Sequence, residues 1–145
     1  MEKTIFAIYL FSAVYCAGSM TVLQLQHFAL YPKVGQEAFK DYVVANNKAA
    51  FLPAIIPALL VFITTAILLL TRPPFMALPT VLISFALNLI NLASSFMWQA
   101  RLHSELAGIG YDEPLIQRLI RTNWIRTIAL FAQALLAVNC VVSAL

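Results

Sequence analysis

Apolar residues lie along the chain in long blocks that polar segments separate. Four such blocks cover about residues 4–31, 49–71, 77–100 and 122–144. Each can cross the hydrocarbon core of a bilayer, which takes about 20 helical residues. Because lipid offers the backbone no hydrogen-bond partner, each crossing must be a helix. The pattern predicts an all-α protein, an integral membrane four-helix bundle in which residues 1–145 form a single transmembrane domain.

Prolines mark the ends of the first two predicted helices. The Tyr31-Pro32 step ends the first helix, because the residue before a proline is pushed out of the α region, and the proline-containing segment 71–74 ends the second. Between them, Gln36 to Lys48 has apolar residues at helical spacing. It forms either a short interfacial helix or a water-exposed extension of the second helix. Pro53 and Pro57 are expected to kink the second helix near its start.

The third and fourth helices are expected to extend beyond their apolar blocks. The third continues to about Leu106, after which Gly108 and Gly110 break it. The acidic pair 112–113 followed by Pro114 favours a helix start, because acidic groups suit the positive end of the helix dipole and proline suits the first turn. The fourth helix therefore begins well before its apolar part.

The composition agrees with a membrane location. Apolar residues make up 62% of the chain and charged residues 10%, against roughly 45–50% and about 25% in soluble domains. The 9 basic and 6 acidic residues form no long run. The chain is therefore not disordered, and it lacks the basic surface that nucleic acid requires. The expected partner is the lipid bilayer.

The distribution of Lys and Arg predicts the orientation. The first and third loops with their flanks carry seven basic residues, namely Lys33, Lys40, Lys48, Arg101, Arg118, Arg121 and Arg126. The other side carries Lys3 and Arg72. By the positive-inside rule, loops one and three face the cytoplasm and both termini face the periplasm.

Polar residues inside the predicted spans gather toward the side of loops one and three. In a bilayer such residues usually face the bundle interior. The third helix presents one polar face, made of Asn88, Asn91, Ser95, Trp98 and Gln99. The fourth presents another, made of Asn123, Arg126, Thr127 and Gln133. These faces predict a polar pocket at the cytoplasmic end of the bundle.

Eight residues are candidates for this pocket. His27 and His103 are the candidate catalytic residues, and the candidate ligand-binding residues are Tyr31, Asn91, Trp98, Asn123, Trp124 and Arg126. Each has a structural alternative. Asn88 and Asn91 can instead join helices by hydrogen bonds. Tyr31, Trp98 and Trp124 can belong to an aromatic belt at the membrane boundary. Arg118 and Arg121 are expected to contact lipid headgroups, whereas Arg126 lies deeper and either pairs inside the bundle or reaches back to the interface.

The two histidines lie at the same membrane end of the first and third helices. Two facing imidazoles could hold haem or a metal ion, but no third ligand accompanies them, so the sequence predicts no metal ligands and leaves the cofactor unknown. One histidine could instead act as a general base or hydrogen-bond donor, or both could be structural.

Cys16 and Cys140 both lie in apolar spans. If the termini share a side of the membrane, the two residues differ in depth by roughly 10 Å. A disulfide needs Cα atoms within about 7 Å, so we expect two free cysteines that act as small core residues.

Two segments resemble a known family. QLQHFALYPKVGQEAFKDYVVANNKAAFLPAIIPAL and WQARLHSELAGIGYDEPLIQRLIRTNWIRTIAL are similar to two regions of a family of uncharacterised bacterial four-helix membrane proteins. The Thr-Asn-Trp-Ile-Arg-Thr motif, residues 122–127, is the specific part. More distantly, Asn123, Trp124 and Arg126 resemble an element of the DUF1772 or anthrone-oxygenase-like membrane proteins, some of which are linked to oxidation of polycyclic aromatic substrates. The resemblance implies a multi-pass protein of the bacterial inner membrane.

Two functions follow as expectations. In the first, the protein binds a lipophilic small molecule such as a quinone, an aromatic compound or a lipid, and oxidation of that molecule would make it an enzyme. Arg126 and Asn123 would then hold an oxygen of the ligand, the tryptophans would flank its rings, and a histidine would handle a proton. In the second, the protein is a non-enzymatic accessory subunit of a larger membrane complex, or a homo-oligomer, and its polar face joins helices.

Overall fold

The computed structural model describes residues 2–143, apart from the side chain of Phe51. Helices form almost all of this range, and no strand occurs within it. Four described helices are long and apolar enough to cross a membrane, namely Glu2–Lys33, Leu52–Thr71, Leu78–Ile109 and Glu113–Val142. The predicted all-α four-helix membrane bundle is confirmed. Residue 144, the last of the predicted fourth span, lies outside the described residues.

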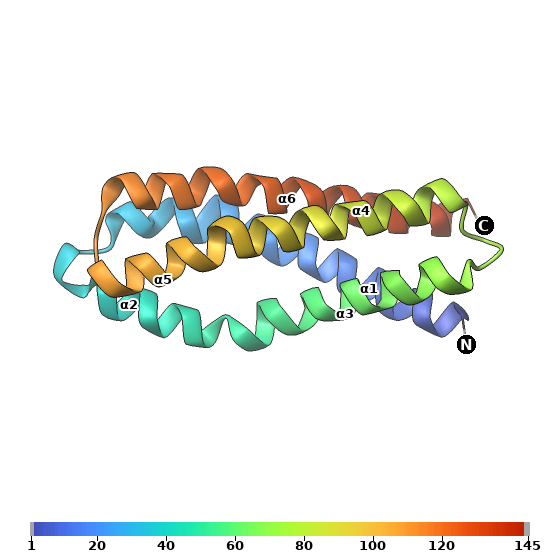
Figure 1. Cartoon of the computed structure of the whole chain (residues 1–145), viewed down its shortest axis with the longest axis horizontal. Coiled ribbons are helices and arrows are strands. Elements are labelled where there is room, and N and C mark those ends of the chain that lie inside the picture. Colours follow the sequence, from blue (N-terminus) through green and yellow to red (C-terminus); the bar gives the residue numbers. More distant parts are fainter. Residues whose placement is uncertain (1, 144–145) are drawn as a thin grey trace.

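The helices form four rods that run side by side (Figure 1). Rod one is α1 (Glu2–Val22), a π-helical turn (Leu23–His27) and a 3-10 turn (Phe28–Lys33). Rod two is α2 (Gln36–Ala49), a π-helical turn (Phe51–Ile55) and α3 (Ile56–Thr71). Rod three is α4 (Leu78–Ser94), a π-helical turn (Ser95–Gln99) and α5 (Ala100–Ile109), and rod four is α6 (Glu113–Val142). Rods one and three each pack against rods two and four, which closes the bundle.

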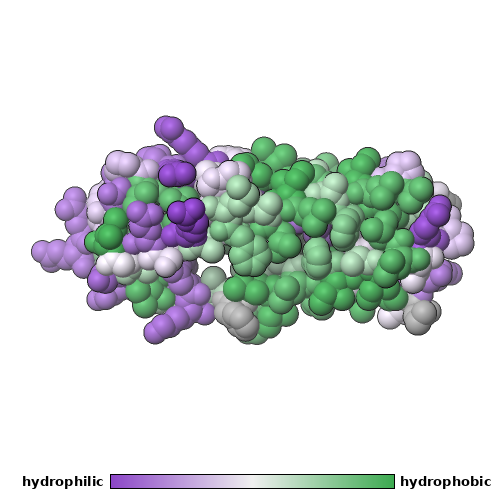
Figure 2. Space-filling model, viewed as in Figure 1, coloured by the Kyte–Doolittle hydropathy of each residue, from purple (hydrophilic) through white to green (hydrophobic). Residues whose placement is uncertain are grey.

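The two ends of the bundle differ in surface character. Both termini and the connection between α3 and α4 lie at one end, and α2, α5 and the start of α6 lie at the other (Figure 1). The surface is apolar over the part of the bundle that leads to the end with the termini, with hydrophilic residues at the tip of that end, and it is hydrophilic around α2 and α5 (Figure 2). The 30 residues of α6 span about 45 Å, whereas a hydrocarbon core is about 30 Å thick. The rods therefore extend out of the membrane at the α2–α5 end, which we call the aqueous end.

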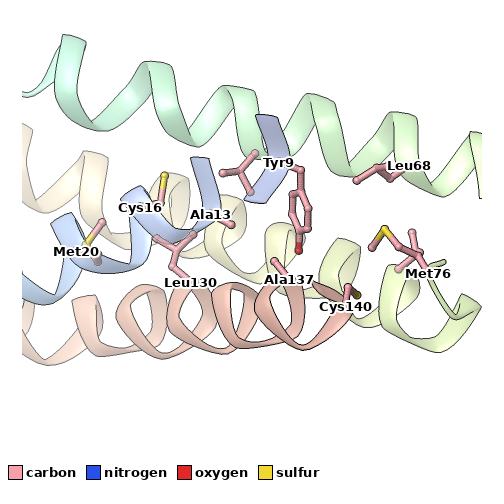
Figure 3. Close-up of a cluster of buried hydrophobic side chains, with 11 residues drawn as sticks. Tyr9, Ala13, Cys16, Met20, Leu68, Met76, Leu130, Ala137 and Cys140 are labelled. Carbon is pink, nitrogen blue, oxygen red and sulfur yellow. The ribbon is translucent and has the colours of Figure 1, made fainter. Parts of the chain in front are cut away.

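Each part of the bundle has its own buried cluster. The cluster in the apolar part is made of Tyr9, Ala13, Cys16, Met20, Val61, Leu68, Met76, Val81, Leu130, Ala137 and Cys140 (Figure 3). The cluster at the aqueous end is made of Phe28, Tyr31, Phe39, Val43, Leu102, Leu106, Ile116 and Leu119. Both cysteines are free and buried, as expected for small core residues.

Local sequence signals place the boundaries of α5 and α6. The Oδ1 atom of Asp112 accepts a hydrogen bond from the N–H of Leu115 at 2.9 Å, which caps α6 at the predicted start. Gly110 has a φ of 90° and ends α5, whereas Gly108 lies inside that helix. Of the two glycines predicted to break the helix, only Gly110 does so.

Two boundary expectations need correction or refinement. The Tyr31-Pro32 step does not end rod one, because a 3-10 turn includes Pro32 and the chain leaves the helix only at Val34. Proline fits this turn since it lacks the N–H that a helix interior would use. Of the two alternatives for Gln36–Lys48, the structure shows the extension of the second helix. There, α2 packs against α5 and buries Phe39 and Val43 completely.

Candidate functional site

The lipid-facing surface ends at one level on three of the rods. The exposed apolar residues nearest this level are Leu52, Met97 and Trp124. The first exposed charged residues beyond them toward the aqueous end are basic, namely Lys48, Arg101 and Arg121. Such a change from apolar to basic side chains is expected where hydrocarbon meets lipid headgroups. This level, which we call the membrane boundary, is where the interior polar residues gather.

A buried hydrogen-bond network crosses the bundle just inside the membrane boundary. Arg126 donates from Nε to Asn91 Oδ1 and from Nη1 to Asn123 Oδ1, each at 3.3 Å. Asn123 donates from Nδ2 to Gln24 Oε1 at 2.8 Å, and Gln24 donates from Nε2 to the carbonyl of Ile120 at 3.2 Å. We call Gln24, Asn91, Asn123 and Arg126 the polar layer, which joins rods one, three and four.

Within the polar layer, Asn123 holds Arg126 rather than facing open space. Its side chain is 0% exposed, and both its amide oxygen and its amide nitrogen are bonded to protein groups. No carboxylate among residues 2–143 forms an ion pair with Arg126. Two amide oxygens therefore hold this guanidinium in place of a counter-ion, which leaves part of its donor capacity for another acceptor.

A cluster of aromatic residues with both histidines lies next to the polar layer on the aqueous side. The ring of His27 lies 5.1 Å from that of Tyr31, and Phe28 lies 5.5 Å from His27 and 5.9 Å from His103, between ring centroids. The Tyr31 hydroxyl accepts a hydrogen bond from Asn46 Nδ2 at 2.9 Å. Both histidines thus pack against Phe28, and each has one buried ring nitrogen without a partner, Nε2 in His27 and Nδ1 in His103.

A large cavity opens sideways between rods one and two, at the membrane boundary. It has a volume of about 620 Å³, and its lining residues are Val14, Tyr15, Gly18, Ser19, Val22, Leu23, His27, Asn46, Ala49, Ala50, Pro53 and Ala54. Figure 2 shows an opening in the surface at the level where the bend of rod two lies in Figure 1. The lining is mainly apolar, with the hydroxyl-bearing Ser19 partway along it and His27 and Asn46 near its aqueous end. We call this cavity the groove.

Three π-helical turns occur at this same level. Those at Leu23–His27 and Phe51–Ile55 border the groove, and the one at Ser95–Gln99 brings Gln99 within 2.9 Å of the Thr122 hydroxyl, to which it donates. Single π-helical turns are rare and occur frequently at functional sites, since the extra residue reorients the side chains that follow. Their coincidence at one level supports a site there.

The two tryptophans are not part of the polar layer or the groove. Trp124 is 42% exposed and lines an apolar depression with Thr21 and Leu25, between rods one and four. Trp98 lines a different cleft, between rods three and four, with Arg101 and Arg118. Both lie at the membrane boundary, where an aromatic belt is expected.

A second polar network lies deeper in the apolar part, and sequence reasoning identified only two of its members. Asn88 donates to the hydroxyl of Thr65 at 2.9 Å, and Gln133 donates to the same hydroxyl at 3.5 Å and to the carbonyl of Ser84 at 3.3 Å. The Tyr9 hydroxyl donates to that of Ser84 at 3.2 Å. The spacing of Ser84, Asn88 and Asn91 on one helical face was the available signal. Asn88 therefore joins helices.

Comparisons of the chain with protein-family models, with curated proteins and with solved structures found no match.

Proposed function

We propose that this protein binds a lipophilic molecule with an oxygen-bearing polar end, in the groove between rods one and two. The observation that supports the proposal is the pairing of an apolar, laterally open cavity with a histidine at its aqueous end, His27, whose Nε2 is buried without a hydrogen-bond partner. A volume of about 620 Å³ lies within the usual range of about 300–1,000 Å³ for small-molecule sites.

The groove matches an elongated ligand that enters from the membrane. Its lining runs along rod one from Val14 to His27, about 20 Å at 1.5 Å per residue. The apolar end lies among Val14, Tyr15 and Ala54, within the lipid-facing part of the bundle. A hydrocarbon tail would lie there, and the polar end of the molecule would reach His27 and Asn46 at the membrane boundary.

His27 is suited to bind an oxygen of this ligand. Its Nδ1 lies 3.4 Å from the Tyr42 hydroxyl. When that hydroxyl donates to Nδ1, the ring proton lies on Nε2, which can donate to a carbonyl or carboxylate oxygen. A quinone, an aromatic ketone or a lipid acid offers such an acceptor. The groove supports the binding of such a molecule, whereas its oxidation rests on the family resemblance alone.

In this proposal the polar layer supports the site without lining it. Arg126 and Asn123 do not line the groove. They fix rod one to rods three and four through Gln24, which lies in the same π-helical turn as His27. We therefore assign Asn91, Asn123 and Arg126 a positioning role, and Tyr31 the role of holding Asn46.

The test uses photoreactive ligands in a mild detergent. We would compare three probes with the same diazirine-bearing alkyl chain, ending in a quinone, a carboxylic acid or a methyl group, and map the labelled peptides. We expect saturable labelling within residues 14–23 and 49–54, stronger for the two oxygen-bearing probes. His27→Phe keeps an aromatic ring and should reduce labelling by those two probes to the level of the methyl-ended one.

A second variant blocks the groove without disturbing the fold. A Cβ added at Gly18 meets nothing within 4 Å, so Gly18→Leu should project into the groove and abolish saturable labelling. The matched control is Ala7→Leu, an exposed position on the same helix outside the groove. Unsaturable labelling spread over all four rods, unchanged by Gly18→Leu, would overturn the proposal and favour the accessory-subunit alternative.

A further inference from the structure

A separate cleft lies on the outer surface between rods three and four. It has a volume of about 250 Å³ and is lined by Met97, Trp98, Arg101, Leu102, Glu105 and Arg118. It shares no lining residue with the groove between rods one and two. Its position at the membrane boundary makes it accessible to the headgroups of surrounding lipids.

The charges in the cleft are unpaired. Arg101 and Arg118 come from different rods, and within the described residues neither guanidinium forms an ion pair or hydrogen bond, including with Glu105. Two like charges that share a cleft repel each other, and an anion between them removes that repulsion. The planar guanidinium fork matches the oxygens of a phosphate in a bidentate arrangement.

The depth of these residues matches the layers of a phospholipid. Met97 is 58% exposed on the lipid-facing side. Arg101 follows one turn, about 6 Å, closer to water, and Glu105 follows one further turn. The order along the rod is therefore an apolar side chain, a basic one and an acidic one. A lipid with an acyl chain, a phosphate and then an ammonium group presents the complementary order.

We propose that this cleft binds the headgroup of phosphatidylethanolamine. Its phosphate lies between Arg101 and Arg118, its ammonium group pairs with Glu105, and the start of an acyl chain lies along Met97 beside the Trp98 ring. The carboxylate is the feature that selects this lipid over a purely anionic one, since Glu105 repels a second negative charge and attracts an ammonium.

The test measures binding of water-soluble lipids to the purified full chain. Trp98 lines the cleft, so in a Trp124→Phe background its fluorescence reports occupancy. We would titrate dioctanoyl phosphatidylethanolamine, phosphatidylglycerol and phosphatidylcholine, together with O-phosphoethanolamine and inorganic phosphate. We expect saturable binding that is tightest for phosphatidylethanolamine. The two free phosphates distinguish a lipid site from a phosphate site, and binding of either one as tight as that of the lipid would overturn the proposal.

Variants separate the contributions of phosphate and ammonium. Arg101→Gln and Arg118→Gln should each weaken phosphatidylethanolamine binding about tenfold, since each removes charge-assisted hydrogen bonds. Glu105→Gln should weaken phosphatidylethanolamine binding severalfold while leaving phosphatidylglycerol binding equal or tighter.

The control variant is Arg121→Gln, at an exposed arginine on α6 outside the cleft, and it should not change the binding of any of these lipids. Equal losses in Arg121→Gln, or tighter binding of phosphatidylglycerol by the unmodified chain, would overturn the proposal. Neither result depends on whether the groove binds its ligand.

Discussion

Arg126 on α6 donates from Nε to the side-chain oxygen of Asn91 on α4 across 3.3 Å, and so joins rods four and three just inside the membrane boundary. The same guanidinium reaches Asn123 with Nη1. Because one planar group holds two amide oxygens from different rods, the geometry depends on the shape of arginine as well as on its charge.

Replacement of Arg126 by lysine should therefore destabilise the bundle. An ammonium on a flexible chain cannot hold both amide oxygens in the same positions, so we expect Arg126→Lys to lower stability by about 1–3 kcal/mol. Arg121→Lys is the matched control at an exposed position of the same helix, outside the cleft that Arg118 lines, and should have a negligible effect. Thermal unfolding in detergent measures both. Equal, negligible changes in the two variants would mean that Arg126 only extends toward the headgroups.

The hydrogen bond between Asn88 and Thr65 should show measurable coupling. It joins α4 to α3 inside the apolar part at 2.9 Å. In a double-mutant cycle with Asn88→Leu and Thr65→Val, we expect a coupling free energy of about 0.6 kcal/mol and at most about 1.7, the range found for such bonds in membranes. Unfolding of the four proteins in mixed micelles provides the values. Strict additivity of the single variants would show that this bond does not stabilise the bundle.

The two glycines at the end of α5 should respond to alanine in opposite directions. Gly110 has a φ of 90°, where a Cβ is strained, so Gly110→Ala should lower stability by about 1–3 kcal/mol. Gly108 lies within the helix with open space around it, and Gly108→Ala should raise stability by up to about 1 kcal/mol. Thermal melts of both variants check this. An unchanged stability in Gly110→Ala would show that the turn does not require glycine.

Cysteine labelling tests the orientation that the basic residues predict. Gln36 and Ser104 are exposed at the aqueous end, Ala77 is exposed at the opposite end, and the native cysteines are buried. If loops one and three are cytoplasmic, an impermeant thiol reagent added to intact cells should label Ala77→Cys but not Gln36→Cys or Ser104→Cys. The reverse pattern would invert the topology, and opposite labelling of Gln36→Cys and Ser104→Cys would contradict the bundle itself.

The sequence by itself determined the four rods and most of their ends. A hydrocarbon core requires long apolar helices, so block length alone gives the number of crossings. The start of α6 depends on Asp112 and Pro114, which act through local capping, and the end of α3 depends on the segment around Arg72. Helical spacing also placed Asn123, Thr127 and Gln133 on one buried face of α6.

Only the tertiary structure decided which of the candidate residues meet. Trp98 and Gln99 are neighbours in sequence, yet Gln99 is buried and Trp98 lines an outer cleft, because one helical step turns a side chain by about 100°. Each π-helical turn also changes the direction in which the side chains after it point. A regular 3.6-residue period does not predict this change. The groove depends on where rod two bends away from rod one. Pro53 and Pro57 predict that rod two bends, but whether the bend leaves a cavity against rod one depends on packing between distant segments, which no local pattern in the sequence encodes.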